Sequence, residues 1–273
     1  MYLWRPRYGK PPIGSTLVKG HPLLVSMIYF APLNEGEGVI HEILNARPNI
    51  TQGGLTTTMW GTGPAGNGLY INAFQWQITG AMGSVLQGQI TIPCSIAVGL
   101  AWIGAPNTSS MLFGASLNNT NATPFDAIGF RTNASQQPIL SFSSGATYYT
   151  IANTTAPTQQ IPYVYSGTLT ATNQYLYLNG YQIGTSANAL TTFSWGTNSS
   201  IYFGNAPAGN VNSRINVAWG ALWNRALAPN EHQWMGQSVN AIYEVLAPAE
   251  NYAQKTTIVP RRSASMGILA GVH

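Results

Sequence analysis

Charged side chains are scarce in this chain. Only 7% of its 273 residues are Asp, Glu, Lys or Arg, against roughly a quarter in ordinary soluble domains. Hydrophobic residues still make up 45%, which is too many for a disordered chain. Asn, Thr, Ser, Gly and Gln replace the missing charges. A polar but uncharged surface of this kind suits a protein that is packed among neighbours or that lies outside cells.

Cysteine and long apolar runs are lacking as well. Cys94 is the single cysteine, so an intrachain disulfide is excluded, and its apolar strand position predicts a buried thiol. The longest apolar run, residues 22–33, is too short and too interrupted to span a bilayer, so no membrane partner is expected. The first residues contain no apolar core of a signal peptide, and we expect none.

The few acidic and imidazole side chains form no catalytic pattern. A glycosidase needs two carboxylates about 5 to 9 Å apart, but no strand carries alternating acidic residues, and Glu35 and Glu37 lie in a Gly-rich turn. A Gly-x-Ser-x-Gly elbow is absent. We expect no enzymatic activity and no catalytic residue. Four histidines are interpreted as surface or structural: His21, His41, His232 and His273.

Cofactor and metal motifs are missing too. Residues 61–66 match G-x-G-x-x-G, but Pro64 falls inside the match and a strand follows it, so no helix start is available for a phosphate. Calcium takes six to eight oxygen ligands, usually including charged ones, and Asp126 is the lone aspartate. We therefore expect no cofactor, and a Ca²⁺ site is disfavoured.

The chain is rich in β-strand alternation. Residues 91–103 carry apolar side chains at even positions and small or polar ones at odd positions. This pattern places one strand face in a core and the other against small neighbours or solvent. Turn residues separate further strand-like runs at spacings typical of an all-β sandwich. These runs lie around residues 110–116, 127–131, 139–142, 146–151, 162–168 and 200–203.

Two motifs in the last third are more specific. Residues 175–184 (YLYLNGYQIG) predict two strands joined by Asn-Gly, because that dipeptide accepts the positive φ angles of a tight hairpin turn. In residues 215–231 (INVAWGALWNRALAPNE) the odd positions from 215 to 223 predict one apolar strand face. A short helix should begin at Pro229, with Glu231 in its first turn, and one or two short helices end before Pro248.

This order resembles the closing section of laminin-G-like, concanavalin A-like jelly-roll domains, and residues 21–38 (HPL…NEGEG) resemble their opening strand. The resemblance covers roughly residues 21–248. It implies an all-β, two-sheet antiparallel jelly-roll sandwich with one or two short C-terminal helices and extended arms at both ends. The corresponding division is an arm over 1–20, the sandwich over 21–248 and a second arm over 249–273.

Basic residues without acidic partners gather at both ends of the chain. We interpret the ends either as arms that dock on acidic protein surfaces or as solvated, flexible termini. Apolar neighbours such as Trp4 and Tyr8 favour docking, and nucleic acid is disfavoured as a partner. The candidate docking residues are Arg5, Arg7, Lys10, Lys19, Lys255, Arg261 and Arg262.

Two functions are open from the sequence. The resemblance, which extends to bacteriophage virion proteins, implies a structural virion protein: a capsid decoration, spike or tail-associated jelly roll. Such a protein would be made in the host cytoplasm and would bind other virion proteins and copies of itself through its arms. The alternative is a lectin-like module that binds host or surface glycans. Trp102, Trp219 and Trp223 fall on apolar faces, which predicts core packing, whereas Trp60, Trp76 and Trp195 lie in or near loops and are the candidate glycan contacts.

Overall fold

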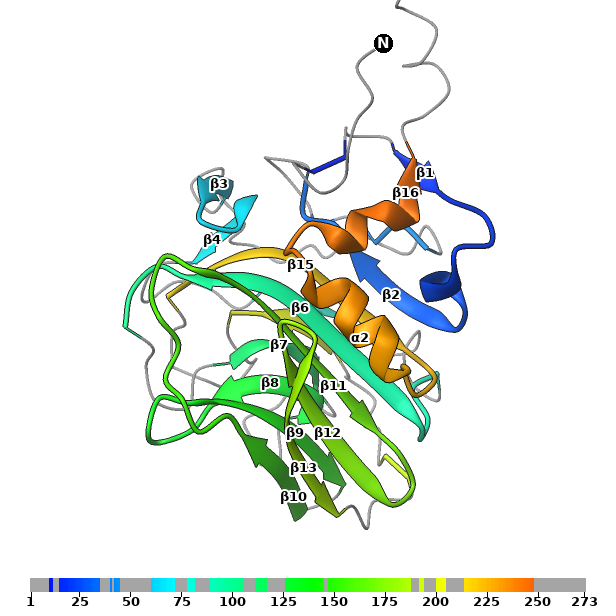
Figure 1. Ribbon diagram of the computed structural model, residues 1–273, viewed down its shortest axis with the longest axis vertical. Coiled ribbons are helices and arrows are strands. Elements are labelled where there is room, and N and C mark those ends of the chain that lie inside the picture. Colours follow the sequence, from blue (N-terminus) through cyan, green and yellow to red (C-terminus); the bar gives the residue numbers. More distant parts are fainter. Residues whose placement is uncertain are drawn as a thin grey trace, which may run out of the picture.

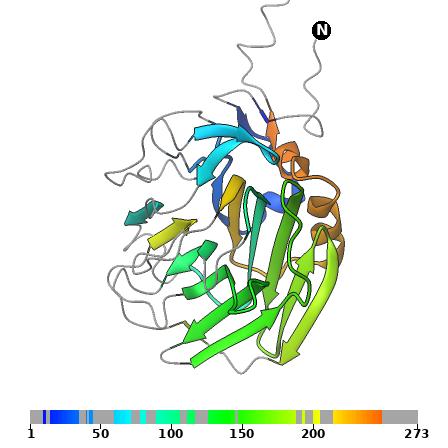
Figure 2. The same cartoon turned by 90° about the vertical axis from the view of Figure 1, so that its left-hand side faces the viewer.

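Two antiparallel β-sheets packed face to face form the body of the molecule (Figures 1 and 2). The computed structural model describes residues 10–11, 15–34, 40, 42–44, 60–71, 78–81, 89–105, 111–116, 126–144, 147–187, 192–193, 200–204 and 214–247. Within these ranges strand is the main secondary structure, as the alternation predicts. None of the described helices is long and apolar enough to cross a membrane.

The larger sheet has eight strands. Its order is β13 (Tyr181–Ala187), β12 (Asn173–Leu178), β11 (Pro162–Leu169), β6 (Cys94–Trp102), β15 (Ile215–Trp223), β4 (Gly66–Ile71) and β3 (Trp60–Gly63), and β2 (Met27–Ala31) pairs with the second half of β15. The second sheet has the order β10 (Thr147–Ala152), β9 (Pro138–Ser144), β8 (Asp126–Thr132), β7 (Met111–Ser116), β14 (Ser200–Phe203) and β5 (Ile78–Ala81). Sequence neighbours pair within each sheet, and strands distant in the sequence meet at its centre.

The main core lies between the two sheets. The even residues of β6, from Cys94 to Trp102, face the aromatic rings of Phe113, Phe130 and Phe142 from the second sheet. This confirms the alternation predicted for residues 91–103. Burial raises the pKa of the Cys94 thiol, so the cysteine is the inert packing residue that its position predicts.

A second core lies on the outer face of the larger sheet. Three short helices contribute to it, η2 (Pro22–Leu24), α2 (Pro229–Gly236) and η4 (Ala241–Val245). Helix α2 lies over β6 and β11, and η2 lies beside β2 (Figures 1 and 2). Because both faces of β6 and β15 are buried, all nine residues of each strand are buried. The helix predicted to begin at Pro229 is confirmed, and it is the element that positions the candidate site below.

One prediction for β15 is wrong. Its odd residues do not share a face, because a β-bulge shifts the register between Val217 and Trp219. Ile215 and Val217 therefore lie in the main core, whereas Trp219 and Trp223 lie in the outer core beneath the helices. Their indole N–H groups donate to backbone carbonyls, and the Trp223 bond measures 2.7 Å. Both tryptophans are core residues, as predicted.

The bulge also explains the position of Lys10. The Lys10 ammonium donates to the carbonyl oxygens of Pro32 (3.1 Å), Leu33 (2.5 Å) and Ala218 (2.7 Å), and Ala218 is the residue within the bulge. The hydroxyl of Tyr243 lies 2.9 Å from the same Ala218 oxygen. One residue of the predicted N-terminal arm is therefore bonded to its own sandwich.

The first predicted strand and the arm boundary differ from the structure in detail. Residues 21–33 begin with η2, and only Met27–Ala31 are strand. The short strand β1 (Thr16–Leu17) pairs with β16 (Leu246–Ala247), so residues within the predicted arm are tied to the end of the body. Residues 1–9 and 12–14 of the predicted N-terminal arm and the whole predicted C-terminal arm, 249–273, lie outside the described residues.

Candidate functional site

The predicted hairpin is confirmed and forms one wall of the candidate site. Strands β12 and β13 meet at Asn179-Gly180, whose φ angles are 48° and 83°. The side-chain oxygen of Asn179 accepts a 2.8 Å hydrogen bond from the Val164 N–H, and the Asn179 N–H donates to the Val164 carbonyl. Asn179 therefore holds the turn against β11 rather than presenting itself to a ligand.

Helix α2 forms the opposite wall, and glycines bring the two walls together. A Cβ at Gly180 would lie 2.6 Å from the Gln233 Cα, and a Cβ at Gly236 would overlap the turn backbone. The Asn-Gly dipeptide thus satisfies two demands, the positive φ of the turn and the close approach of the helix. The relative position of hairpin and helix is consequently fixed by backbone contact.

An ion pair between Arg225 and Glu231 fixes the start of α2. The guanidinium of Arg225 donates to both carboxylate oxygens of Glu231, at 2.7 and 2.5 Å, and also donates to the Val25 carbonyl. The Ala228 N–H donates to the same carboxylate at 2.8 Å. Burial alone would raise the pKa of Glu231, but the bonds from Arg225 and Ala228 outweigh it and lower the pKa. These residues of the closing motif therefore have a structural role.

A buried histidine, His232, connects α2 to the larger sheet by hydrogen bonds and ring stacking. His232 is 0% exposed, and its ring stacks on Tyr177 at 3.8 Å. Its Nδ1 lies 2.8 Å from the Ser166 hydroxyl, and its Nε2 lies 3.0 Å from that of Thr168. Burial lowers the pKa of His232 to about 3, so the ring is neutral at ordinary pH. This is the structural histidine that the sequence predicts, and its full burial keeps any substrate from reaching the Ser–His pair.

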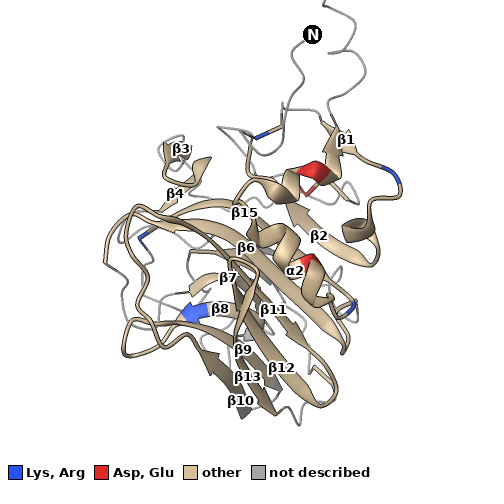
Figure 3. Ribbon diagram, viewed as in Figure 1, with Lys and Arg blue, Asp and Glu red and all other residues tan. Residues whose placement is uncertain are grey.

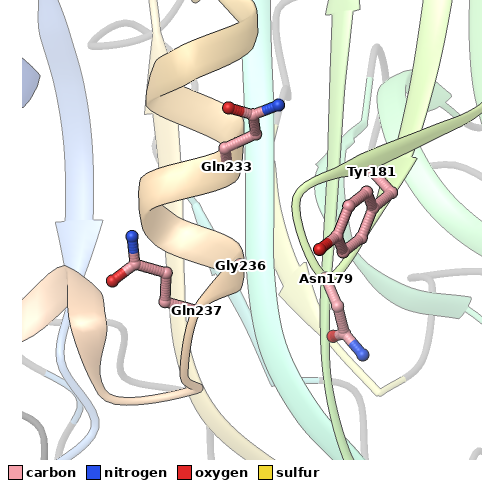
Figure 4. Close-up of a pocket in the computed structure, with 5 residues that line it drawn as sticks. All are labelled: Asn179, Tyr181, Gln233, Gly236 and Gln237. Carbon is pink, nitrogen blue, oxygen red and sulfur yellow. The ribbon is translucent and has the colours of Figure 1, made fainter.

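Between the hairpin and α2 lies a pocket of about 520 Å³, lined by Asn179, Tyr181, Gln233, Gly236 and Gln237 (Figure 4). Its volume falls within the range of about 300 to 1,000 Å³ that is usual for small-molecule sites. Tyr181 is 74% exposed, and its hydroxyl is directed toward the helix in Figure 4. Gln233 extends from α2, and Gln237, the residue after its last turn, extends to the side of the helix away from Tyr181 in Figure 4. The pocket is therefore lined by an exposed aromatic ring and by amide side chains.

A smaller hollow of about 270 Å³ lies on the other flank of α2. It is lined by His21, Pro22, Leu23, Asn230, Glu231 and Trp234. The rings of His21 and Trp234 are 5.3 Å apart, and the His21 Nδ1 accepts the Leu23 N–H at 3.3 Å. Because its imidazole and carboxylate already have partners within the chain, this hollow is less suited to a ligand than the pocket beside the hairpin.

No group of three or more His, Cys, Asp or Glu side chains that could hold a metal ion occurs among the described residues. The Asp126 side chain lies outside the described part. The donors of the pocket are amides and a phenol, which are not the charged oxygens that Ca²⁺ usually takes.

Comparisons with solved structures show similar folds at low sequence identity. Domain 4 of AbnA, a GH43 extracellular arabinanase from Geobacillus stearothermophilus solved in complex with arabinotriose, matches 78% of this chain and 98% of its own, with 12% identity and a TM-score of 0.57. The binding domain of Paraclostridial Mosquitocidal Protein 1 matches 78% of this chain and 52% of its own, with 12% identity and a TM-score of 0.58. No protein-family model and no curated sequence matches the chain.

Trypanosoma rangeli sialidase, solved with the inhibitor DANA, is a third match, with 17% identity and a TM-score of 0.53. The alignment covers 77% of this chain but only 32% of the sialidase, so the chain spans about a third of that enzyme's length. Similarities at this level of identity show the fold. The body is a concanavalin A-like jelly roll.

The structure describes only three of the predicted docking and glycan-contact residues: Lys10, Lys19 and Trp60. Trp60 is 8% exposed and packs in the main core rather than in a loop, and Lys10 is bonded to its own chain as described above. Lys19 is exposed at a turn next to β1. The other predicted docking and glycan-contact residues lie outside the described part: Arg5, Arg7, Lys255, Arg261, Arg262, Trp76 and Trp195.

Sequence reasoning did not find the pocket of the jelly roll. Tyr181 and Gln233 are far apart in the sequence; the 175–184 motif that contains Tyr181 predicts a hairpin and no contact, and Gln233 belongs to no motif. Two signals were present. Tyr181 directly follows the turn of the predicted hairpin, and the glutamines at positions 233 and 237 lie four residues apart at the end of the predicted helix. Only the packing of the helix on the hairpin brings these signals together.

Proposed function

We propose that this jelly roll is a non-catalytic carbohydrate-binding module and that it binds sugars in the pocket between α2 and the β12–β13 hairpin. The observation that supports the proposal is the exposed ring of Tyr181 at a pocket that the amide residues Gln233 and Gln237 also line. Aromatic rings cover the apolar faces of sugar rings, and amides exchange hydrogen bonds with their hydroxyl groups. The arabinotriose complex of a similar fold is consistent with this function.

The walls of the pocket and the chemistry of its lining favour binding of a ligand over catalysis. The pocket walls are held by backbone contact at Gly180 and Gly236, so little conformational entropy is lost when a ligand enters. The described lining residues supply hydrogen-bond donors and acceptors, and among them there is no carboxylate pair and no nucleophile with an adjacent base. We therefore propose adhesion rather than hydrolysis. The virion role and the docking arms predicted from the sequence stay predictions.

The proposal is tested by substituting the aromatic platform. Tyr181→Ala should weaken binding on a glycan array and in titration calorimetry by about tenfold or more, equivalent to about 1.4 kcal/mol. Ile183→Ala is the matched control, because Ile183 is also exposed on β13 (38%) but does not line the pocket. Binding that is equally strong in both variants would place the site elsewhere, and a folded wild-type chain that binds no glycan would refute the function.

A further inference from the structure

Resting on the proposed carbohydrate site, we infer that the pocket selects neutral, hydroxyl-rich saccharides and rejects acidic ones such as sialylated or uronic-acid glycans. The inference begins with the lining. Among the described residues around the pocket, the polar side chains belong to asparagine, tyrosine and glutamine, and none of them carries a charge. Figure 3 shows how few charged residues the described body contains.

The charged residue of α2 is paired with an arginine of its own chain. On α2 the charged residue is Glu231, which lines the smaller hollow on the opposite flank. Its carboxylate is held by both terminal nitrogens of Arg225. A guanidinium committed to two carboxylate oxygens of its own chain is not available to a sugar carboxylate.

Without a cation, an acidic sugar would lose hydration that the pocket cannot replace. A carboxylate moved from water to a partly enclosed site needs a charged partner or several strong donors. Tyr181 offers one hydroxyl, and Gln233 and Gln237 offer one amide each. Each glutamine amide presents a carbonyl oxygen as well as an NH₂ group, and the carbonyl oxygen would repel a sugar carboxylate.

The same groups match neutral sugars well. Each sugar hydroxyl both donates and accepts a hydrogen bond, and each glutamine amide also does both, so several orientations satisfy both partners. The imidazole of His232, on the buried face of α2, adds no charge that would favour acidic sugars. His232 is neutral above about pH 3 and is fully buried, so it adds no positive charge to the site in the physiological range.

The test measures charge selectivity on the full chain. Wild type is applied to an array that holds neutral glycans and their sialylated or uronic-acid counterparts, at about 0.05 M and about 0.5 M salt. Because the chain carries a formal net charge of +4, weak attraction of acidic glycans to other surfaces should vanish at high salt. Neutral binding at the pocket should change less than about twofold with salt and should fall about tenfold or more in Tyr181→Ala.

A reversed-selectivity variant sharpens the test. Gln233→Arg places a guanidinium on the helix side of the pocket, and it should raise affinity for the acidic counterpart of the best neutral glycan by about tenfold. Gln182→Arg adds the same charge at an exposed position of β13 that does not line the pocket, and it should leave the ratio unchanged.

The outcomes separate the two levels of the proposal. Salt-resistant binding of acidic glycans that is lost in Tyr181→Ala would overturn the charge selectivity while leaving carbohydrate binding intact. Failure of Gln233→Arg to shift the ratio more than Gln182→Arg would also count against it. If wild type binds neither neutral nor acidic glycans, the proposed function itself is refuted, and the selectivity falls with it.

Discussion

Mild acid should destabilise the jelly roll chiefly through one described residue, His232. In the folded protein its pKa is lowered to about 3, against an ordinary value of 6.5, chiefly because the ring is buried. Between these two pH values the His232 imidazole is protonated in the unfolded chain but neutral in the folded protein. The stabilisation is therefore complete above pH 6.5 and is lost progressively as the pH falls toward 3.

The magnitude follows from the shift. Within this window the free energy of unfolding should fall by about 1.4 kcal/mol per pH unit. Between pH 7 and pH 5 the expected loss from His232 is about 2 kcal/mol, because the unfolded imidazole is only partly protonated near its own pKa. Full burial of the ring means that solvent screening does not reduce this figure appreciably.

Urea unfolding followed by tryptophan fluorescence at pH 7 and pH 5 measures the effect. His232→Gln will be less stable at both pH values, because it disturbs the hydroxyl pair at Ser166 and Thr168, but it should lose most of the pH dependence. His21→Asn is the control. The pKa of His21 is also lowered by burial, but that residue is only half-buried, so its variant should retain most of the slope.

A His232→Gln variant with the same pH slope as wild type would refute the reasoning. It would mean that the imidazole is protonated in the folded state, or that other groups carry the acid sensitivity. The experiment also bears on the pocket, because His232 holds the underside of α2. Weakening this anchor at pH 5 should lower glycan affinity in wild type more than in His232→Gln, when each is compared with its own value at pH 7.

Two further substitutions test how the structure is held together. Gly236→Ala should destabilise the fold by about 1 to 3 kcal/mol and weaken glycan binding, because the new Cβ overlaps the backbone at Gly180. Gly61→Ala is the control: the nearest atom to its Cβ would be 3.4 Å away, so neither stability nor binding should change. Lys10→Met should cost about 1.5 to 3 kcal/mol in urea unfolding, because three carbonyls lose a charged donor, whereas Lys19→Met at an exposed turn should change stability by less than about 0.5 kcal/mol. A Lys10→Met protein as stable as wild type would contradict the bonds assigned to that ammonium.

The features predicted correctly are those governed by local rules. The Asn179-Gly180 turn follows from the φ angles that those residues tolerate, and the helix at Pro229 follows from its fixed φ and missing N–H. The even-position core of residues 94–102 follows from the two-residue period of a strand. Each of these depends on a few consecutive residues, so a sequence read in short windows is sufficient.

The features that were missed depend on residues distant in the sequence. Lys10 resembles any basic terminal residue until the Ala218 carbonyl, 208 positions away, is placed against it. The exposed position of Tyr181 acquires meaning only when Gln233 packs across the hairpin. Trp60 stands beside loop residues in the sequence, yet the pairing of β3 with β4 carries it into the core.

The bulge at Ala218 accounts for several of these features at once. Without it, strict alternation would place Ile215, Trp219 and Trp223 on one face, and two indoles would have to fit between the sheets. The extra residue turns both tryptophans outward, where they supply the apolar floor on which the helical layer packs. It also exposes a carbonyl that the ladder cannot satisfy, which Lys10 bonds. The helical layer, and with it one wall of the pocket beside the hairpin, therefore depends on one irregular residue in the central strand.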